Sequence, residues 1–391
     1  MNFPGLRKKP LLREIGKNAV LFLLSLVFAL GIVEVAFRFY NPLGFRIKGN
    51  KIILPVNRTQ IIHNKKNGRL DELVVNRKNS LGFRGEDPPG DFSDWLTIIT
   101  VGGSTTECLA LNEDKSWPQL LGGKLKNHFP KSWLNNAGFG GHSTFGHAIL
   151  MQDFLIKMKP KLVLLLVGTN EVGRSDLSIQ DHNLAGIGFR RLEGALITAA
   201  NHSEVASALL NLYRFYFPVV TTNLGDIGEI DLRSLKNMEI PITKEEAIIA
   251  NHRRNYLPYY RQRLEKLVNL ARENQIDPVL ITQPVLYGEV VDEITGVDLG
   301  KIDIWGATNG KVGWEVMELY NDITRQVGET RGLLVIDLAR ELPKSSRYFY
   351  DLSHYSNEGA SRVGEIIYAH LCPYLAKKYP DHYQAMSPTR H

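Results

Sequence analysis

The chain has 391 residues, of which 43% are hydrophobic, and it carries a formal net charge of +6. This length and apolar content allow a sizeable buried core, so they argue against a disordered chain. The first 17 residues hold five basic side chains and one acidic one, or +4 of the total (5 − 1), so the rest is close to neutral. No basic stripe with interleaved aromatic residues occurs beyond residue 90, and the charge therefore does not indicate a nucleic-acid-binding protein.

The apolar segment at residues 19–40 follows a basic tail, residues 1–18. Residues 19–33 carry no charge, and apolar residues continue after Glu34, giving the roughly 17 to 20 residues that a membrane-spanning helix needs. No small-residue cleavage site follows, which predicts an uncleaved signal anchor instead of a removed signal peptide. Because the basic cluster precedes the helix, we expect the tail in the cytoplasm and the rest of the chain in the periplasm or outside the cell. A buried N-terminal core helix is the alternative, which the uniformly apolar composition disfavours.

After this segment the sequence pattern divides the chain into several parts. Residues 41–94 show only short β-like runs, which predicts a juxtamembrane linker with short strands. Residues 95–380 alternate short apolar runs with helical stretches, a pattern typical of an α/β fold: a parallel sheet between two helical layers in a three-layer α/β/α sandwich. The segment at about 172–244 breaks this rhythm and predicts an insertion over the carboxyl ends of the strands, and residues 381–391 form a C-terminal tail. The predicted strands cover residues 96–101, 161–167, 277–284 and 332–338, and the predicted helices cover residues 117–129, 147–158, 203–217, 245–274, 314–329 and 358–378.

Candidate catalytic residues lie at both ends of the 95–380 domain. Gly102 and Gly103 permit a sharp turn after the first predicted strand, which would expose the Ser104 hydroxyl at the strand's carboxyl end. Capping of the following helix is the alternative role of this serine. Near the other end, Asp351 and His354 are three residues apart on a predicted loop, so the carboxylate can accept from one imidazole nitrogen while the other faces the sheet edge. This is the orienter-and-base arrangement that a serine nucleophile needs.

Two further segments offer hydrogen-bond donors. The glycine-rich segment at residues 135–144 contains Gly141, and Asn170 follows the buried strand predicted at residues 161–167. Acyl transfer needs preorganised donors at the developing oxyanion, each worth ~3 to 4 kcal/mol. The backbone N–H groups of Ser104 and Gly141 and the Asn170 side-chain amide would supply three such donors.

Taken in order, these segments resemble the blocks of the SGNH (GDSL-like) hydrolase family, in a divergent, membrane-anchored branch. The resemblance covers roughly residues 95–380. Two departures stand out: the first block reads Gly-Gly-Ser-Thr instead of Gly-Asp-Ser-Leu, and Glu171 replaces the aspartate often found after the asparagine. An α/β-hydrolase is less consistent with the sequence, because Thr106 stands where the G-x-S-x-G elbow requires its second glycine. The resemblance implies a catalytic triad of Ser104, Asp351 and His354 and an oxyanion hole formed by Ser104, Gly141 and Asn170.

The implied activity is that of a membrane-anchored serine esterase, which hydrolyses carboxylic esters, O-acetyl esters among them, through an acyl-enzyme. An O-acyltransferase acting on envelope polysaccharide would use the same triad, since the two differ only in whether the deacylation site excludes water. A non-catalytic envelope protein that binds through an inherited cleft is a third alternative. The expected partner is an ester substrate, an acylated polysaccharide or lipid, with no nucleic acid, cofactor or metal.

Four other residues have open roles. His142 and His147 flank the glycine-rich segment. We expect each of these side chains to be either buried in the core or solvated, and contact with a substrate is the less favoured alternative. Cys108 and Cys372 are too few for a disulfide framework. The sequence leaves open whether these two cysteines pair.

Overall fold

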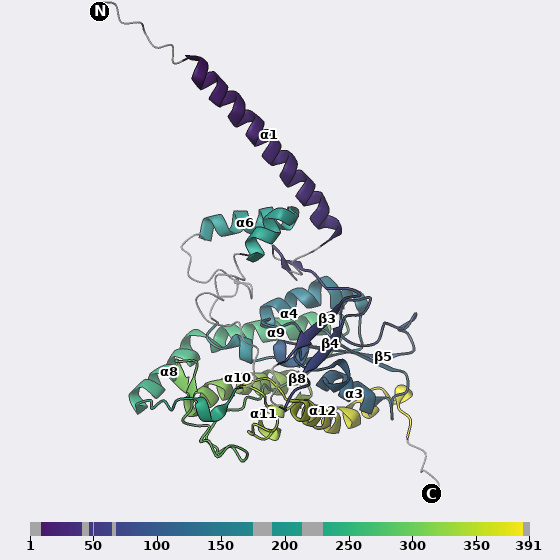
Figure 1. Ribbon diagram of the computed structural model, residues 1–391. Coiled ribbons are helices and arrows are strands. Elements are labelled where there is room, and N and C mark those ends of the chain that lie inside the picture. The colour runs from purple at the N-terminus through teal and green to yellow at the C-terminus, as the bar shows by residue number, and fades with distance from the viewer. Residues whose placement is uncertain are drawn as a thin grey trace, which may run out of the picture. The chain divides into compact units, whose positions relative to one another are not determined.

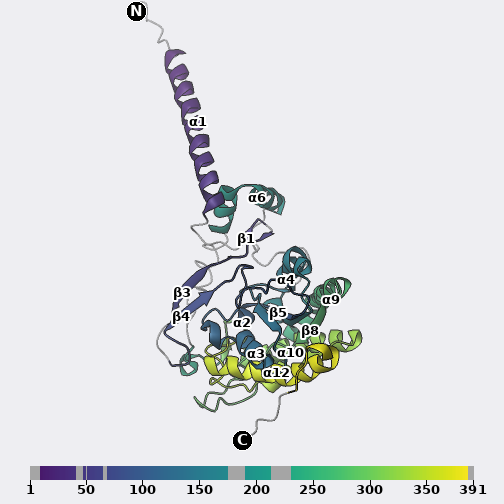
Figure 2. The same ribbon diagram turned by 90° about the vertical axis from the view of Figure 1, so that its right-hand side faces the viewer.

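The computed structural model (Figures 1 and 2) describes residues 9–40, 47–49, 51–64, 68–174, 190–212 and 230–385. The chain forms two compact units. The larger unit comprises Leu54–Asn183 and Leu224–His391, and the smaller one comprises Met1–Ile53 and Leu184–Asn223.

The larger unit is built on a five-stranded sheet with the order β11-β8-β7-β5-β6, in which all neighbouring strands are parallel. Every residue of β5, β6 and β7 is buried, so both faces of the sheet need a cover of helices. The strands are β5 (Leu96–Gly102), β6 (Ser132–Asn136), β7 (Leu162–Leu166), β8 (Asp277–Ile281) and β11 (Val335–Ile336).

Helices cover the two faces as separate layers. On one face α3 (Trp117–Leu125) packs against α12 (Asn357–Lys378), and on the other α9 (Leu257–Glu273) packs against α4 (Thr144–Leu150) and α10 (Gly310–Arg331). Figure 1 shows α4 and α9 above the strands and α3 and α12 below them. The expected three-layer α/β/α sandwich with a parallel sheet is confirmed.

Three local features differ from the sequence predictions. The strand β6 was missed, because its sequence SWLNN is mostly polar although all five residues are buried. The helix predicted at residues 245–274 is two helices, α8 (Ile242–Asn255) and α9, which are separated at Tyr256. Pro258 stands in the first turn of α9, where its missing N–H costs no helical hydrogen bond. The strand predicted at 332–338 is reduced to the two residues of β11.

The segment predicted as a juxtamembrane linker enters the larger unit from Leu54 onward. It contains an antiparallel hairpin of β3 (Thr59–His63) and β4 (Leu73–Arg77). Further along, Arg84 forms an antiparallel bridge with Asn136 at the end of β6. The fully buried Arg84 guanidinium then donates to the main-chain oxygens of Glu107, Cys108 and Leu111.

The smaller unit contains α1 (Lys9–Phe39), in which Glu14–Phe39 is long and apolar enough to cross a membrane, with a mean hydropathy of 2.6. A signal sequence near the N-terminus can also meet these criteria of length and hydropathy. This unit also contains α6 (Arg190–His202) and the helical residues 204–212, which are the described middle part of the predicted insertion. The described residues at the two ends of the predicted insertion, 172–174 and 230–244, belong to the larger unit. The last five residues of the helix predicted at 203–217 lie outside the described residues.

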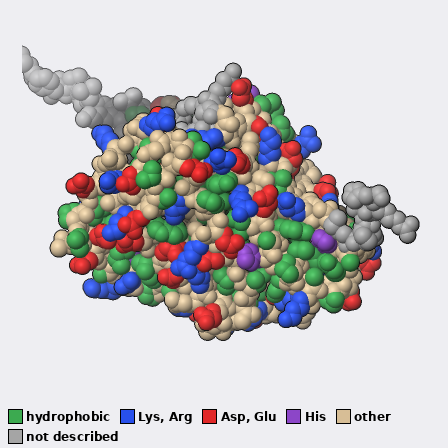
Figure 3. Space-filling view, turned by 90° about the horizontal axis from the view of Figure 1, so that it is seen from below, with side chains coloured by type: hydrophobic (Ala, Val, Ile, Leu, Met, Phe, Trp, Pro, Cys, Tyr) green, Lys and Arg blue, Asp and Glu red, His purple; other side chains and the backbone are tan. Residues whose placement is uncertain are grey.

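Basic and acidic side chains are interspersed on the face that Figure 3 shows, with apolar side chains between them.

Candidate active site

Ser104 lies where the central strand β5 ends. The strand runs to Gly102, Gly103 is the N-cap, and Ser104 begins the four-residue helix α2 (Ser104–Glu107). Gly102 has no room for a side chain, because a Cβ there would overlap the Thr106 hydroxyl and the main-chain oxygen of Leu166. The two glycines therefore allow the tight turn that sets Ser104 at the carboxyl edge of the sheet.

His354 joins Ser104 to Asp351 by two hydrogen bonds. The His354 Nε2 atom lies 2.8 Å from Ser104 Oγ, and the Nδ1 atom lies 2.6 Å from Asp351 Oδ2. The other carboxylate oxygen of Asp351 accepts from the backbone N–H groups of Ser353 at 2.8 Å and His354 at 2.7 Å. The structure thus brings the three predicted residues together, 250 positions apart between Ser104 and His354.

The Asp351 carboxylate is held in its charged form. Burial would raise its pKa, but the hydrogen bonds from the His354 ring and from two backbone N–H groups outweigh burial and keep the pKa below its usual value. The ring of Tyr350 stacks on the His354 imidazole, with 5.6 Å between centroids and 13° between planes. The imidazole is therefore fixed by a charged acceptor and by an aromatic neighbour.

Asn170 lies beside Ser104, in a short 3-10 turn (Thr169–Glu171) that follows β7. Its Nδ2 atom donates to the His142 main-chain oxygen at 2.8 Å, which leaves the second N–H of the amide for another acceptor. Asn170, Gly103 and Ser104 line the same narrow recess.

Gly141 lines a larger cleft of about 530 Å³ together with Ser104 and His354. Its φ of +79° is in the region that favours glycine. The neighbouring Gly140 N–H donates to Glu107 Oε2 at 2.7 Å, and that carboxylate is 2% exposed. Sequence reasoning missed Glu107, although its place three residues after the serine, on the same short helix, was a usable signal.

His142, His147 and Glu171, which line the recess, are buried. The His142 ring stacks on Phe139 at 3.8 Å between centroids, and burial lowers the pKa of His147 to about 3. The Glu171 carboxylate binds Arg263 of α9 at 2.7 Å, and both side chains are almost fully buried. Glu171 and the two histidines thus form part of the packed layer between the Asn170 turn and the helices α4 and α9.

The two cysteines are not paired in the structure. Cys108 lines the cleft, but burial raises the pKa of its thiol to about 12. A thiol with this pKa is inert at neutral pH, so Cys108 does not compete with Ser104 as a nucleophile. Among the described residues, no group of three or more His, Cys, Asp or Glu side chains could hold a metal ion.

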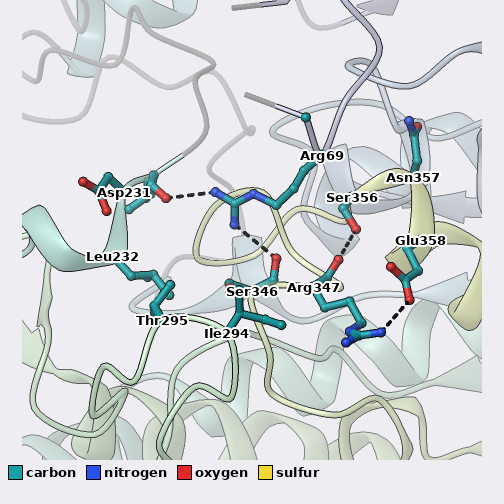
Figure 4. Close-up of a pocket in the computed structure, with 12 residues that line it drawn as sticks. Arg69, Asp231, Leu232, Ile294, Thr295, Ser346, Arg347, Ser356, Asn357 and Glu358 are labelled. Carbon is teal, nitrogen blue, oxygen red and sulfur yellow. Dashed lines mark hydrogen bonds and ion pairs between the residues drawn. The ribbon is translucent and has the colours of Figure 1, made fainter. Parts of the chain in front are cut away.

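A second cavity of about 620 Å³ lies next to the catalytic loop and contains Arg69, which follows β3 of the hairpin (Figure 4). The Arg69 guanidinium donates at 3.1 Å to the main-chain oxygens of Ser346, Phe349 and Ile230. Ile230 lines both cavities. Arg69 therefore ties the hairpin to the segment that leads into Asp351, a contact that no sequence pattern predicted.

Comparison with known proteins adds a family assignment. The sequence model of the GDSL-like Lipase/Acylhydrolase family matches residues 99–362. A search of curated proteins gives no match to the chain.

Among solved structures, the chain is similar to a putative lipolytic protein of the G-D-S-L family from Desulfitobacterium hafniense DCB-2, with 15% identity, a TM-score of 0.38 and coverage of 70% of this chain and 98% of that one. It is also similar to Axe2, an acetylxylan esterase from Geobacillus stearothermophilus, with 13% identity, a TM-score of 0.40 and coverage of 70% and 93%.

The family match spans more than half of the chain and includes Ser104, Gly141, Asn170, Asp351 and His354. The chain belongs to the GDSL-like lipase/acylhydrolase family and is a serine hydrolase of ester bonds.

Proposed function

We propose that this protein is a membrane-anchored esterase that hydrolyses carboxylic esters, O-acetyl esters among them, through an acyl-enzyme on Ser104. The observation that carries the proposal is the continuous pair of hydrogen bonds from Ser104 through His354 to Asp351. A serine hydroxyl is a weak nucleophile by itself, and a base within hydrogen-bond reach that is oriented by a carboxylate activates it.

The proposed reaction proceeds in two halves. Ser104 Oγ attacks the ester carbonyl carbon while His354 Nε2 takes the hydroxyl proton, and the C–O bond of the tetrahedral intermediate breaks as the same proton passes to the leaving alcohol. Water then attacks the acyl-enzyme, His354 accepts a proton from this water, and the carboxylic acid leaves as Ser104 regains its proton. Asp351 fixes the tautomer and stabilises the imidazolium in both halves.

The oxyanion is assigned to three donors: the backbone N–H groups of Ser104 and Gly141 and the side-chain amide of Asn170. Two observations support this assignment. Ser104 shares the narrow recess with Asn170 and shares the larger cleft with Gly141. The Asn170 amide also donates to the His142 main-chain oxygen, and the Gly140 N–H donates to the Glu107 carboxylate. These hydrogen bonds fix the Asn170 side chain and the segment that carries Gly141, so the donors are preorganised.

A combined labelling and turnover experiment tests the esterase. The purified chain is incubated with 4-nitrophenyl acetate and, separately, with a fluorophosphonate probe, next to the Ser104→Ala variant. We expect turnover and labelling of the wild type and neither in the variant. Labelling at Ser104 without turnover would indicate the acyltransferase alternative, and a wild type that is neither labelled nor active would contradict the proposal.

We further propose that α1 is a signal anchor, with the basic tail in the cytoplasm and the catalytic unit on the other side of the membrane. The length and mean hydropathy of Glu14–Phe39 support the membrane span, and the basic residues ahead of it support the orientation. A reporter that is active only outside the cytoplasm, fused after residue 391, should be active. Activity of a reporter that works only in the cytoplasm would contradict the orientation.

A further inference from the structure

We propose that Arg69 is a positioning residue for the catalytic loop, the segment 346–354 that carries Asp351 and His354. Arg69 precedes residues 99–362, which the family model matches, and it acts on the triad through the main chain of this loop. The inference rests on the proposed triad and adds a residue on which the geometry of the triad depends.

The Arg69 guanidinium binds three main-chain oxygens at once. Its Nη1 atom donates to Ser346 and Phe349, and its Nη2 atom donates to Ile230, each at 3.1 Å. In Figure 4 the Arg69 side chain points toward Ser346 on one side and toward the chain at Asp231 on the other. A guanidinium has five N–H donors in one plane, so it can bind several converging oxygens in a fixed geometry, which the flexible ammonium of a lysine cannot do.

The contact with Phe349 leads to His354 across a single peptide group. The peptide group between Phe349 and Tyr350 accepts from Arg69 through its oxygen. It donates through its N–H group to the His354 main-chain oxygen at 3.0 Å. The Tyr350 ring also stacks on the His354 imidazole. A shift of this peptide group would therefore move both the backbone of His354 and the ring against which its imidazole packs.

The contact with Ile230 reaches the next peptide group of the loop. The Ile230 oxygen accepts from Arg69, and the Ile230 N–H donates to the Tyr350 main-chain oxygen at 2.9 Å. This oxygen belongs to the peptide group that Tyr350 shares with Asp351. Arg69 thus fixes the peptide groups on both sides of Tyr350, one directly and the other through Ile230, and these two groups lead into the catalytic carboxylate.

The contact with Ser346 has a second support. The N–H and hydroxyl groups of Ser346 donate to the Asp292 carboxylate at 2.7 and 2.8 Å. Loss of Arg69 should therefore leave the start of the catalytic loop in place. The effect should instead arise at Phe349 and Ile230, next to the triad, as a displacement of the base in a folded protein.

The test measures kcat, KM and the labelling rate of Ser104 in Arg69 variants of the full chain. For Arg69→Ala we expect kcat on 4-nitrophenyl acetate to fall about 10-fold to 100-fold with KM within about 2-fold of wild type, because a small displacement of a catalytic group slows the chemical step. The rate of labelling by the fluorophosphonate probe should fall by a similar factor, since labelling needs the same base. Arg69→Lys keeps the charge but not the planar donors, so its kcat should lie between those of Arg69→Ala and the wild type.

Chemical rescue distinguishes positioning from a merely structural role. Arg69 is partly exposed and lines a cavity of about 620 Å³, so a guanidinium ion can enter the space that Arg69→Ala leaves. Guanidinium chloride at millimolar concentrations, far below the molar range that unfolds proteins, should restore part of the lost kcat in Arg69→Ala. It should restore none in Arg69→Lys, where the lysine side chain occupies the space, and sodium chloride of equal concentration should restore none in either variant.

Two variants of the same region are matched controls. Arg77→Ala removes an exposed arginine of β4. Lys115→Ala removes the ion pair with Asp71 at 2.6 Å, which ties the hairpin to the rest of the unit through residues outside the catalytic loop. Both controls should keep kcat within about 2-fold of wild type, and melting curves should show that each variant is folded at the assay temperature.

Several outcomes would overturn the positioning role. A wild-type kcat in Arg69→Ala contradicts it, and so does an equal loss of kcat in Lys115→Ala, which would assign the effect to the docking of the hairpin. A folded Arg69→Ala whose kcat guanidinium does not restore would leave Arg69 a structural role only. If Arg69→Ala does not fold, a wild-type kcat in Arg69→Lys contradicts the role. A wild type that is neither labelled nor active would instead contradict the esterase itself.

Discussion

Asn170 occupies the space that a side chain at Gly103 would need. A Cβ at residue 103 would lie 2.5 Å from Asn170 Nδ2, closer than any ordinary contact. The first block reads Gly-Gly-Ser-Thr here, and a side chain at this position, such as the aspartate of Gly-Asp-Ser-Leu, would require the Asn170 amide to shift from its observed position. The departure from the motif is thus a change in packing that leaves the proposed donor beside Ser104.

Replacing Gly103 by alanine should therefore damage catalysis more than folding. The added methyl group pushes the Asn170 amide away from its position, and a displaced oxyanion donor costs about 10-fold to 100-fold in kcat. KM for 4-nitrophenyl acetate should change little. Steady-state kinetics with a thermal melt of each protein makes the comparison, and Gly123→Ala is the control because a Cβ there meets nothing within 4 Å. An unchanged kcat in Gly103→Ala would show that the site tolerates the shift.

Removing the donor itself should have a larger effect. We expect Asn170→Ala to lower kcat by roughly 100-fold or more while KM stays nearly constant, because the amide acts mainly in the transition state. Asn170→Asp is the informative companion, since it keeps the shape but replaces a donor by an acceptor. A change confined to KM would assign Asn170 to substrate binding instead.

The buried side chain of His147 should make the free energy of unfolding depend on pH. Burial lowers the pKa of His147 to about 3 from an ordinary 6.5, so below pH 6.5 the unfolded chain binds a proton that the folded protein does not. The free energy of unfolding should accordingly decrease as the pH falls from 6.5 toward 3, by at most about 1.4 kcal/mol per pH unit from this residue. Above pH 6.5 the residue contributes no pH dependence.

Denaturant titrations between pH 4 and 7 provide the measurement. His147→Leu should show a shallower loss of stability in this range than the wild type, whereas His63→Gln, at an exposed position, should match the wild type. Identical slopes for the wild type and His147→Leu would mean that His147 titrates in the folded protein as it does in the unfolded chain.

Glu34 has a structural role in the smaller unit. Its carboxylate accepts from Ser203 Oγ at 2.8 Å and from the backbone N–H groups of Glu204 and Val205 at 3.0 and 3.1 Å. These N–H groups begin the helix of residues 204–212, so Glu34 caps that helix from α1. A carboxylate inside an apolar helix is costly unless it is paired in this way.

Glu34→Ala should therefore loosen the helix of residues 204–212, with a loss of about 1 kcal/mol or more of local stability. Hydrogen exchange of the detergent-solubilised chain should become faster at the amides of Glu204 and Val205, and Glu34→Gln, which keeps one acceptor oxygen, should show a smaller effect. Turnover of 4-nitrophenyl acetate serves as the activity control and should not change. Unaltered exchange in Glu34→Ala would contradict the capping role.

The sequence patterns predicted those elements whose buried residues are mostly apolar. The strands β5, β7 and β8 consist mostly of apolar residues, and Ser104 could be placed because a buried strand and two glycines precede it. The strand β6 was missed because the burial of its polar Asn135 and Asn136 depends on distant partners. Their side-chain amides donate to the main-chain oxygens of Glu86 and Thr106. Such partners are visible only in three dimensions.

The same limit applies to the site. Asp351 and His354 are close in sequence and share one loop, so their pairing was predictable. Arg69 approaches the site from a hairpin that carries no catalytic pattern, and only the fold brings it there.

The last prediction concerns Ser104, His354 and Asp351 acting as one unit. Ser104→Ala and His354→Ala should each lower kcat by several orders of magnitude. The double variant should be scarcely slower than either, because proton transfer by His354 does not contribute to catalysis without the serine that it activates. Asp351→Asn should cost less, since the imidazole can still act when its tautomer is no longer fixed. Burst kinetics with 4-nitrophenyl acetate and melting curves of all variants provide the measurement. Losses that multiply in the double variant would mean that the serine and the histidine act independently, and full activity of Ser104→Ala would remove the serine from its assigned role.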